Sequence, residues 1–232
     1  MESHYSLTNE EIVILTTESS RLYDSPIDSY ILNELLNMVY DALEKHKRIM
    51  AVRTDLRFAQ SHVTGEPDLP LCFQRDDMQA ITRFTESLKS QLRADHNRSR
   101  RPGDPTLPSY GWCRERDTSE HPHYHLMLLF NGDVYRYLGN YKDRNGDNMA
   151  TRIQKAWCSA LGLAHEDYAT LAEFPPNAVY RFSRFDALDR NPVYWNFLVR
   201  LAYLAKTRTK DVHSGYRNFG ASQCPRLGGL AC

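Results

Sequence analysis

Residues 120–130 constrain the fold of this chain more than any other stretch, because clustered histidines lead directly into an apolar run. His121, His123 and His125 are three of the nine histidines in the chain, and the apolar residues 126–130 follow them at once. Residues two apart in a β-strand point to the same face, so His123 and His125 would project side by side. Such a pair can bind a divalent metal ion. A His-rich hairpin that binds no metal is the alternative that this stretch leaves open.

The composition limits what kind of protein can carry this stretch. The 232 residues are enough for one substantial core and few for two full domains. Equal numbers of basic and acidic residues, 29 each, argue against a polybasic binder, although local basic patches can still bind nucleic acid. Five cysteines without a CxxC pair favour a reducing compartment. Because we see neither a secretion signal nor an apolar run near the roughly 20 residues that span a bilayer, we expect a cytoplasmic protein without a membrane segment.

The hydrophobic periodicity predicts an α+β fold, in which an antiparallel sheet of about five strands has helices packed on it. We expect an N-terminal arm over 1–24, one main domain over 25–215 and a C-terminal tail over 216–232. Within the domain we expect helices over 25–47, 78–92, 134–141 and 149–161, and one beginning at Asn191 and Pro192; strands over 48–59, 110–116, 121–130 and 178–185; and loops over 60–74 and 96–103.

The two central strands are close enough in sequence to form a hairpin with a turn over 117–120. If the turn is centred near Ser119, Glu115 lies opposite His123. Directly opposite residues share a face, with Cβ atoms about 5 Å apart, so Glu115 would complete a site of two histidines and a carboxylate. A register shift of one residue would turn Glu115 away. His121 has the same parity as His123 and is the reserve ligand.

Two further groups of residues are candidates for the chemistry. Tyr203 and Lys206 are spaced i and i+3 on the last predicted helix and would share a face. Tyr194, nine residues before Tyr203, would face the opposite way and is predicted to be core. The candidates for contacts with DNA phosphates, for which solvated surface charge is the alternative, are Arg53, Arg57, Arg98, Arg100, Arg101 and Lys210.

These motifs, in this order, resemble those of the HUH endonucleases, in which a hydrophobic residue, here Tyr124, stands between the two histidines. The order of the motifs, with the histidines before the tyrosine, resembles that of the replication-initiator branch. Relaxases have the opposite order, with the tyrosine upstream of the histidines. A narrower resemblance rests on four motifs: Trp112-x-Arg114-Glu115, His123-Tyr124-His125 with the apolar run to Asn131, Tyr203-x-x-Lys206 with Lys210, and Arg217-Asn218-Phe219-Gly220-x-Ser222. With these motifs, residues 45–222 resemble the replication proteins of inoviruses and their prophage-borne YagK/YfjJ-type relatives.

The resemblance implies a ferredoxin- or RRM-like HUH fold and a DNA-nicking activity. His123, His125 and Glu115 would bind Mg²⁺ or Mn²⁺, and Tyr203 would attack a phosphodiester of single-stranded DNA to give a 5′-phosphotyrosine and a free 3′-OH. Free tyrosine has a pKa of about 10, so Lys206 would stabilise the phenolate or the phosphate. The expected role is to start rolling-circle replication of a phage, prophage or plasmid-like element at an origin hairpin, with a host helicase as a further partner.

Three alternatives from other classes remain open. The first is a zinc hydrolase that uses His121, His123 and His125. The second is a sheet-based nucleic-acid-binding module that stacks bases on Tyr110, Trp112 and Tyr124, although we expect that face of the sheet to be core. The third is an initiator that binds an origin without cutting it.

Overall fold

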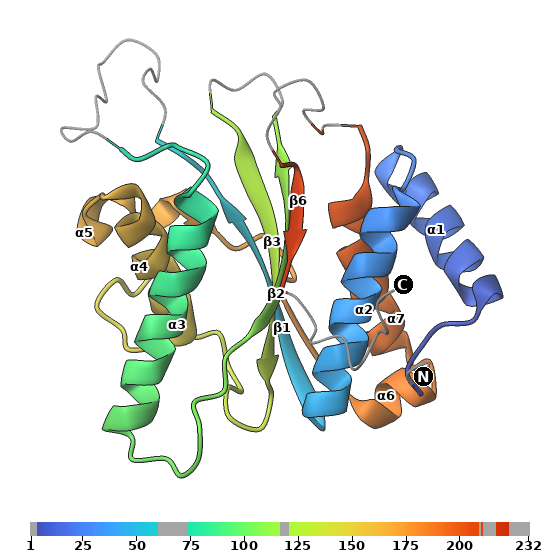
Figure 1. Cartoon of the computed structure of the whole chain (residues 1–232), viewed down its shortest axis with the longest axis horizontal. Coiled ribbons are helices and arrows are strands. Elements are labelled where there is room, and N and C mark those ends of the chain that lie inside the picture. The colour runs from blue at the N-terminus through green and yellow to red at the C-terminus, as the bar shows by residue number, and fades with distance from the viewer. Residues whose placement is uncertain (1–3, 60–73, 117–120, 209, 211–216, 223–232) are drawn as a thin grey trace, which may run out of the picture.

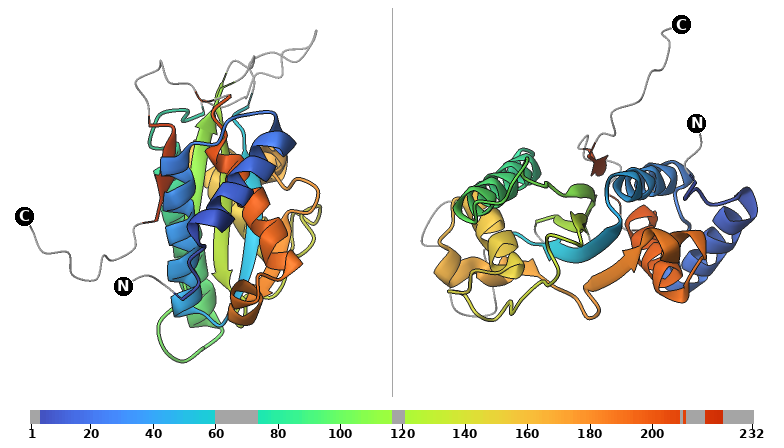
Figure 2. Two further views of the ribbon diagram at one scale, coloured as in Figure 1. Left: turned by 90° about the vertical axis from the view of Figure 1, so that its right-hand side faces the viewer. Right: turned by 90° about the horizontal axis from the view of Figure 1, so that it is seen from below.

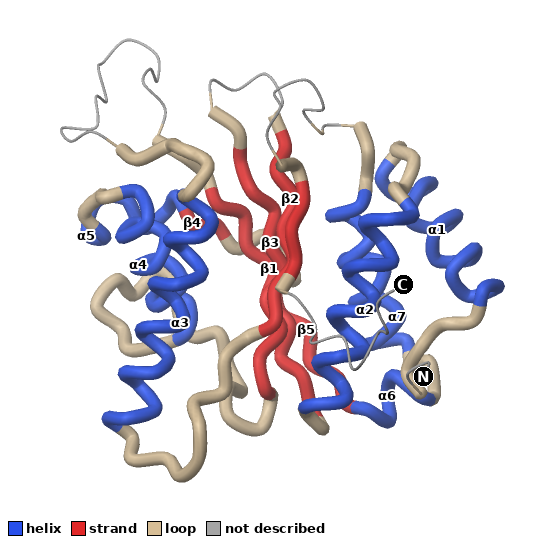
Figure 3. Tube along the Cα trace, viewed as in Figure 1, coloured by secondary structure: helices blue, strands red, loops and turns tan. Residues whose placement is uncertain are grey.

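A central antiparallel sheet separates two layers of helices in the computed structural model, which describes residues 4–59, 74–116, 121–208, 210 and 217–222 (Figure 1). The strand order is β4-β1-β3-β2-β6, and β5 pairs with β1 beside β4 (Figure 3). The described residues therefore confirm an α+β fold with six strands, where about five were expected. The strands are β1 (Arg48–Leu56), β2 (Ser109–Glu115), β3 (His123–Asn131), β4 (Ala172–Glu173), β5 (Val179–Ser183) and β6 (Phe219–Ala221).

The helices divide between the two faces of the sheet, as the view from below in Figure 2 shows. One layer contains α1 (Asn9–Tyr23), α2 (Ser29–Lys45), α6 (Arg184–Leu188) and α7 (Pro192–Ala202). The other contains α3 (Ala80–Arg98), α4 (Met149–Leu161) and α5 (His165–Tyr168). None of these described helices is long and apolar enough to cross a membrane.

Local signals placed several helix ends correctly. Asn191 caps α7 by accepting a hydrogen bond from the Val193 amide, and Pro192 occupies the first turn, as predicted. Gly162 ends α4 in the left-handed conformation with φ of 75°, also as predicted. Most of the predicted loop over 60–74, the predicted turn over 117–120 and most of the predicted tail lie outside the described residues.

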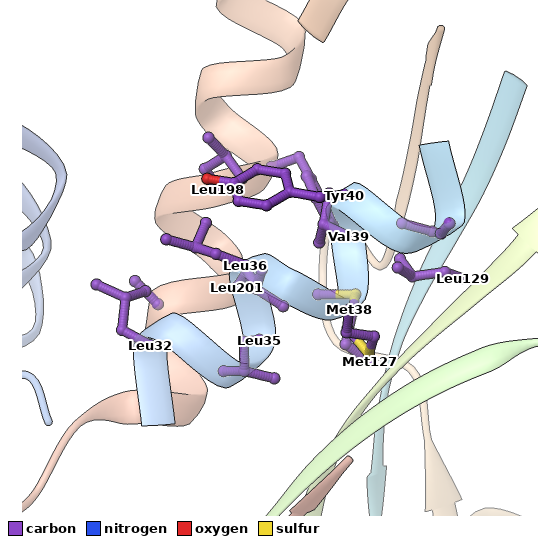
Figure 4. Packing of buried hydrophobic residues seen from close by; sticks show 14 of the residues in the cluster. Leu32, Leu35, Leu36, Met38, Val39, Tyr40, Met127, Leu129, Leu198 and Leu201 are labelled. Atoms are coloured by element: carbon purple, nitrogen blue, oxygen red, sulfur yellow. The ribbon is translucent and has the colours of Figure 1, made fainter. Parts of the chain in front are cut away.

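Both faces of the sheet are buried. Tyr124, Leu126, Leu128 and Phe130 of β3 belong to the core under α3 and α4, which confirms the predicted core face. The alternate residues Met127 and Leu129 belong to a second core with α2 and α7. Figure 4 shows α2 lying between α7 and the sheet, with side chains directed to both. His123 and His125 therefore emerge from a strand that is held rigidly on both sides.

The N-terminal arm expected over 1–24 is wrong for residues 9–23, which form α1. Thr8 caps this helix through a reciprocal capping box with Glu11: the Thr8 side chain accepts from the Glu11 amide, and the Glu11 carboxylate accepts from the Thr8 amide. At the other end of α1, the Tyr23 hydroxyl donates to the Val199 carbonyl of α7 at 2.9 Å. This helix is therefore part of the folded body.

The helix expected from Ser25 begins later, at Ser29, with Asp28 as its cap. The residues before it pair instead with the segment that follows α7. The Asp28 amide donates to the Ala205 carbonyl at 2.8 Å, and the Thr207 amide donates to the Pro26 carbonyl at 3.0 Å. This pairing fixes the turn that carries Tyr203 and Lys206.

Two other predictions need correction. Residues 134–141, all of them described, form no helix. The predicted tail over 216–232 contains β6, which pairs with β2 and adds a strand at the edge of the sheet.

Candidate active site

The hairpin register brings the predicted metal ligands together. Glu115 pairs with His123 and Cys113 pairs with His125, as the sequence predicted. A shift of one residue would have moved Glu115 to the opposite face. Because Cys113 and Met127 of the same face are fully buried, the packing itself specifies this register.

The geometry of the three side chains fits a divalent cation. The Nε2 atoms of His123 and His125 are 3.1 Å apart, and His125 Nε2 lies 3.2 Å from Glu115 Oε2. Neighbouring ligands of an octahedral Mg²⁺ ion, each about 2.1 Å from the metal, are roughly 3.0 Å apart. Among the described residues, no other group of three or more histidine, cysteine or acidic side chains could hold a metal ion.

The electrostatics favour ligand forms that bind metal. Burial, with the charge of His125 beside it, lowers the pKa of His123 to about 4. His123 is therefore neutral near pH 7 and keeps a lone pair available for a metal ion. Glu115 is 1% exposed and pairs with Lys206, whose Nζ lies 3.0 Å from Glu115 Oε2.

Two residues of β1 support His125, and the sequence did not single out this role. Asp55 pairs directly with His125 across β1 and β3. Asp55 Oδ1 lies 2.8 Å from His125 Nδ1, and Arg53 Nη2 lies 2.7 Å from the same nitrogen. Nδ1 either donates to Asp55 or accepts from Arg53. Only the first arrangement leaves the Nε2 lone pair free for a metal.

Asp55 remains a carboxylate in this setting. Burial would raise its pKa, but the hydrogen bond to His125 and the charge of Arg53 outweigh burial and hold the pKa well below its usual range. The negative charge favours a proton on His125 Nδ1. Asp55 is therefore placed to orient His125, the predicted metal ligand.

We expect the Asp55→Asn substitution to weaken Mn²⁺ binding about 10- to 100-fold, the typical cost of losing such support behind a ligand. The neutral amide no longer favours the proton on Nδ1, so Arg53 can donate to that nitrogen instead. Isothermal titration calorimetry with Mn²⁺ measures the change, and circular dichroism checks the fold. Asp133→Asn, at the other end of the sheet, is the matched control. Equal affinity in Asp55→Asn and the parent protein would refute the positioning role.

Tyr203 and Lys206 lie against the cluster. The helix ends at Ala202, and Tyr203–Ala205 form a 3₁₀ turn, in which positions i and i+3 are eclipsed. Lys206 Nζ is thereby 2.9 Å from Tyr203 Oη as well as 3.0 Å from Glu115 Oε2. One ammonium group therefore connects the tyrosine hydroxyl to Glu115, a predicted metal ligand, and the predicted pair lies at the predicted site.

Two rings and a guanidinium fix the orientation of Tyr203. Its ring meets those of His125 and Tyr23 edge to face, each at 5.0 Å between centroids. The Arg53 guanidinium carbon lies 4.5 Å from the centre of the Tyr203 ring. Because Tyr23 belongs to α1, the helix that replaced the expected arm helps to position the tyrosine.

The predicted phosphate-binding residues fall into separate groups. Arg57 follows the end of β1 at the cluster and pairs with Glu173 at 3.1 Å. Lys210 also lies near the cluster: its Nζ is buried without a partner among the described residues, and burial lowers its pKa. Arg53 is only 2% exposed and contacts His125 and Tyr203, so its burial supports neither the predicted contact with a DNA phosphate nor the alternative of solvated charge.

The basic loop predicted for DNA binding lies away from the cluster. Arg98 and Arg101 pair with Asp95 at the end of α3, and the chain then enters β2 at Ser109, the strand end remote from Glu115. Arg98, Arg100 and Arg101 therefore cannot contact a phosphate held by His123 and His125. A contact with a more distant part of the DNA remains a prediction.

The reserve ligand is also separated from the site. His121 precedes the first residue of β3, its ring contacts Phe58 at 5.8 Å, and its Nδ1 lies 3.5 Å from Asp76. The ligand set expected for a zinc hydrolase is therefore not assembled. The stacking surface expected for a binding module is not available either, because Trp112 and Tyr124 are only 8% and 3% exposed beneath α3 and α4.

Comparison with known proteins places the site in a family. The model of the YagK/YfjJ C-terminal domain matches residues 8–222, which include α1 and the whole cluster. The Escherichia coli (strain K12) "Uncharacterized protein YfjJ" is 36% identical over 210 residues, covering 87% of this chain and 99% of that protein. "Uncharacterized protein YagK" of the same strain is 36% identical over 182 residues, covering 77% of this chain and 85% of that protein. No solved structure matches the chain.

Proposed function

The chain belongs to the YagK/YfjJ C-terminal domain family, and we propose that it is a metal-dependent HUH endonuclease that cuts and rejoins single-stranded DNA through Tyr203. The observation that carries the proposal is the bridge formed by Lys206. Its ammonium contacts both the Tyr203 hydroxyl, at 2.9 Å, and Glu115, at 3.0 Å, beside the histidine pair. A nucleophile and a metal site that share one cation suit attack on a phosphate bound at that metal.

The reaction is a transesterification. The Tyr203 hydroxyl gives up its proton and its oxygen forms a bond to phosphorus. The bond from phosphorus to the 3′ oxygen breaks, and that oxygen takes a proton and leaves as a 3′-OH. The 5′ phosphate stays on Tyr203, so the energy of the phosphodiester is kept, and attack by a 3′-OH reverses the step without ATP. A divalent ion held by His123, His125 and Glu115 would neutralise charge on the phosphate and polarise its P–O bond.

Lys206 supports the attack as a cation. Burial lowers the pKa of Lys206, but the hydrogen bond to Tyr203 and the charge of Glu115 outweigh burial and raise the pKa above its usual value. The residue therefore stays protonated and cannot act as the general base. It stabilises the phenolate that forms on Tyr203, in the manner expected of a preorganised charge at a developing anion.

The biological role we propose is replication initiation for a phage, prophage or plasmid-like element in the cytoplasm of a bacterial cell. A single covalent tyrosine suits a cut that leaves a 3′-OH for a polymerase and a 5′ end held for later rejoining. Single-stranded DNA at an origin hairpin would be the substrate, and a host helicase would open the duplex.

A pool of randomised single-stranded oligonucleotides tests this proposal without knowledge of the origin sequence. We expect Mn²⁺ to produce adducts that survive heating in SDS and that can be isolated and sequenced. EDTA should abolish them, because the charge on the scissile phosphate is then not neutralised. Cleavage that leaves no adduct would point to a hydrolase. The absence of both cleavage and adduct across the pool would refute nicking by this protein.

A further inference from the structure

A hollow lies at the end of the sheet remote from the cluster of Glu115, His123 and His125. Its volume is about 740 Å³, and its walls come from the start of β1, the turn after β3, and β5. His123 and Asn131 are at opposite ends of β3, so the hollow and the cluster are roughly 27 Å apart along that strand. The volume is in the usual range for a ligand site.

The lining combines an apolar floor with a basic and aromatic rim. Ile49, Met50 and Phe182 lie at the floor, where they also belong to the two cores. Tyr137 is 74% exposed at the rim, and the Arg181 guanidinium carbon lies 5.3 Å from the centre of its ring. A large aromatic ring left in solvent beside an arginine is the arrangement that stacks a base in single-stranded nucleic-acid binders.

The charges at the hollow leave cations available. The two acids that line it are engaged: Asp133 pairs with Arg48 at 2.6 Å, and Asp186 accepts from the Ser183 amide and hydroxyl at 2.7 Å and 2.6 Å. In the described part of the chain, neither Arg136 nor Arg181 pairs with an acid. Arg181 Nε donates only to the Arg136 carbonyl, at 2.9 Å, which holds the two arginines together.

We propose that this hollow binds a segment of single-stranded DNA, with Arg136 and Arg181 on its phosphates and one base stacked on the free face of Tyr137. The basic loop of residues 98–101 lies at the same end of the sheet, since the Arg101 guanidinium carbon is 5.8 Å from the ring of Tyr135, another lining residue. That loop supplies further positive charge along the proposed path of the DNA strand. This site is separate from the cluster and needs no metal and no covalent step.

Fluorescence anisotropy with a labelled single-stranded oligonucleotide of mixed sequence, in EDTA, tests the site. We expect Tyr137→Ala to weaken binding about tenfold, the usual effect of losing one stacked base. The double substitution Arg136→Ala and Arg181→Ala should make the slope of log K against log salt shallower by about 1.4, or about 0.7 for each lost phosphate contact. Tyr30→Ala on α2 and Arg93→Ala on α3 are matched exposed controls and should bind normally.

Each outcome decides the proposal. Normal binding and an unchanged salt slope in the hollow variants would overturn it, as would equal losses in the two controls. Displacement of the oligonucleotide by a free deoxynucleoside monophosphate would overturn the assignment to a strand, and equal binding of a duplex would overturn base stacking. The assay is run in EDTA and measures binding alone, without the metal ion that the proposed nicking requires. A failure of the proposed nicking activity would therefore leave the result unchanged.

Discussion

Replacement of Tyr203 by phenylalanine is expected to abolish the covalent DNA adduct while the fold and the metal cluster remain intact. The substitution removes only the hydroxyl. The ring keeps its edge-to-face contacts with Tyr23 and His125, and Lys206 keeps its ion pair with Glu115. Loss of a nucleophile typically costs on the order of 10⁴-fold or more in rate, so denaturing gels should show no adduct with the oligonucleotide pool.

Tyr194→Phe is the matched control for this experiment. Tyr194 lies on α7, the helix that leads into the turn carrying Tyr203, but it is fully buried, as predicted, and its hydroxyl has no hydrogen-bond partner among the described residues. Its removal should change neither stability nor the adduct. If Tyr203→Phe still forms an adduct, mass spectrometry of the linked peptide will identify the true nucleophile, and the role assigned to the Tyr203–Lys206 pair would have to be withdrawn.

The parts of the site that the sequence predicted correctly are the parts that local geometry determines. The spacing of His123 and His125 places both on one face of any strand. A short turn limits the hairpin register, and the choice of Ser119 as its centre set Glu115 opposite His123. Tyr203 and Lys206 meet because positions three apart are neighbours in either kind of helical turn.

The parts that the sequence did not reveal depend on pairing between distant segments. Asp55 reaches His125 only because β1 pairs with β3, and nothing local to either strand fixes that partner. The charged face of β1 suggested a surface that meets solvent or phosphates. The sequence did not show that helices cover both faces of the sheet. By contrast, α1 had a readable signal: Thr8 and Glu11 have the spacing of a capping box.

The separation of the predicted basic residues changes the expected path of DNA. Arg57 and Lys210 lie at the cluster, whereas Arg101 lies at the opposite end, near the hollow lined by Arg136 and Arg181. Basic groups at both ends of one sheet are consistent with a single DNA strand that runs along the protein. A chain with zero net charge can bind DNA in this way because local patches, rather than net charge, contact the phosphates.

Removal of a proposed metal ligand is the second change for which we expect a large effect. His125→Ala should eliminate measurable Mn²⁺ binding, because His125 Nε2 lies within 3.2 Å of both other ligand atoms and is central to the cluster. Calorimetry reports the binding directly. Thermal melting gives a second readout, since a ligand at 100 times its Kd stabilises the native state by about 2.7 kcal/mol. The parent protein should therefore melt higher with Mn²⁺, and the variant should not.

His121→Ala is the control that separates the cluster from the neighbouring histidine. His121 contacts Phe58 and Asp76 outside the cluster, so its loss should leave both the Mn²⁺ affinity and the metal-dependent rise in melting temperature unchanged. A marked loss of affinity in His121→Ala would restore it as a ligand and would mean that the start of β3 rearranges when metal binds. Retained binding in His125→Ala would instead remove the histidine pair from the metal site, and the proposed role of Glu115 would fall with it.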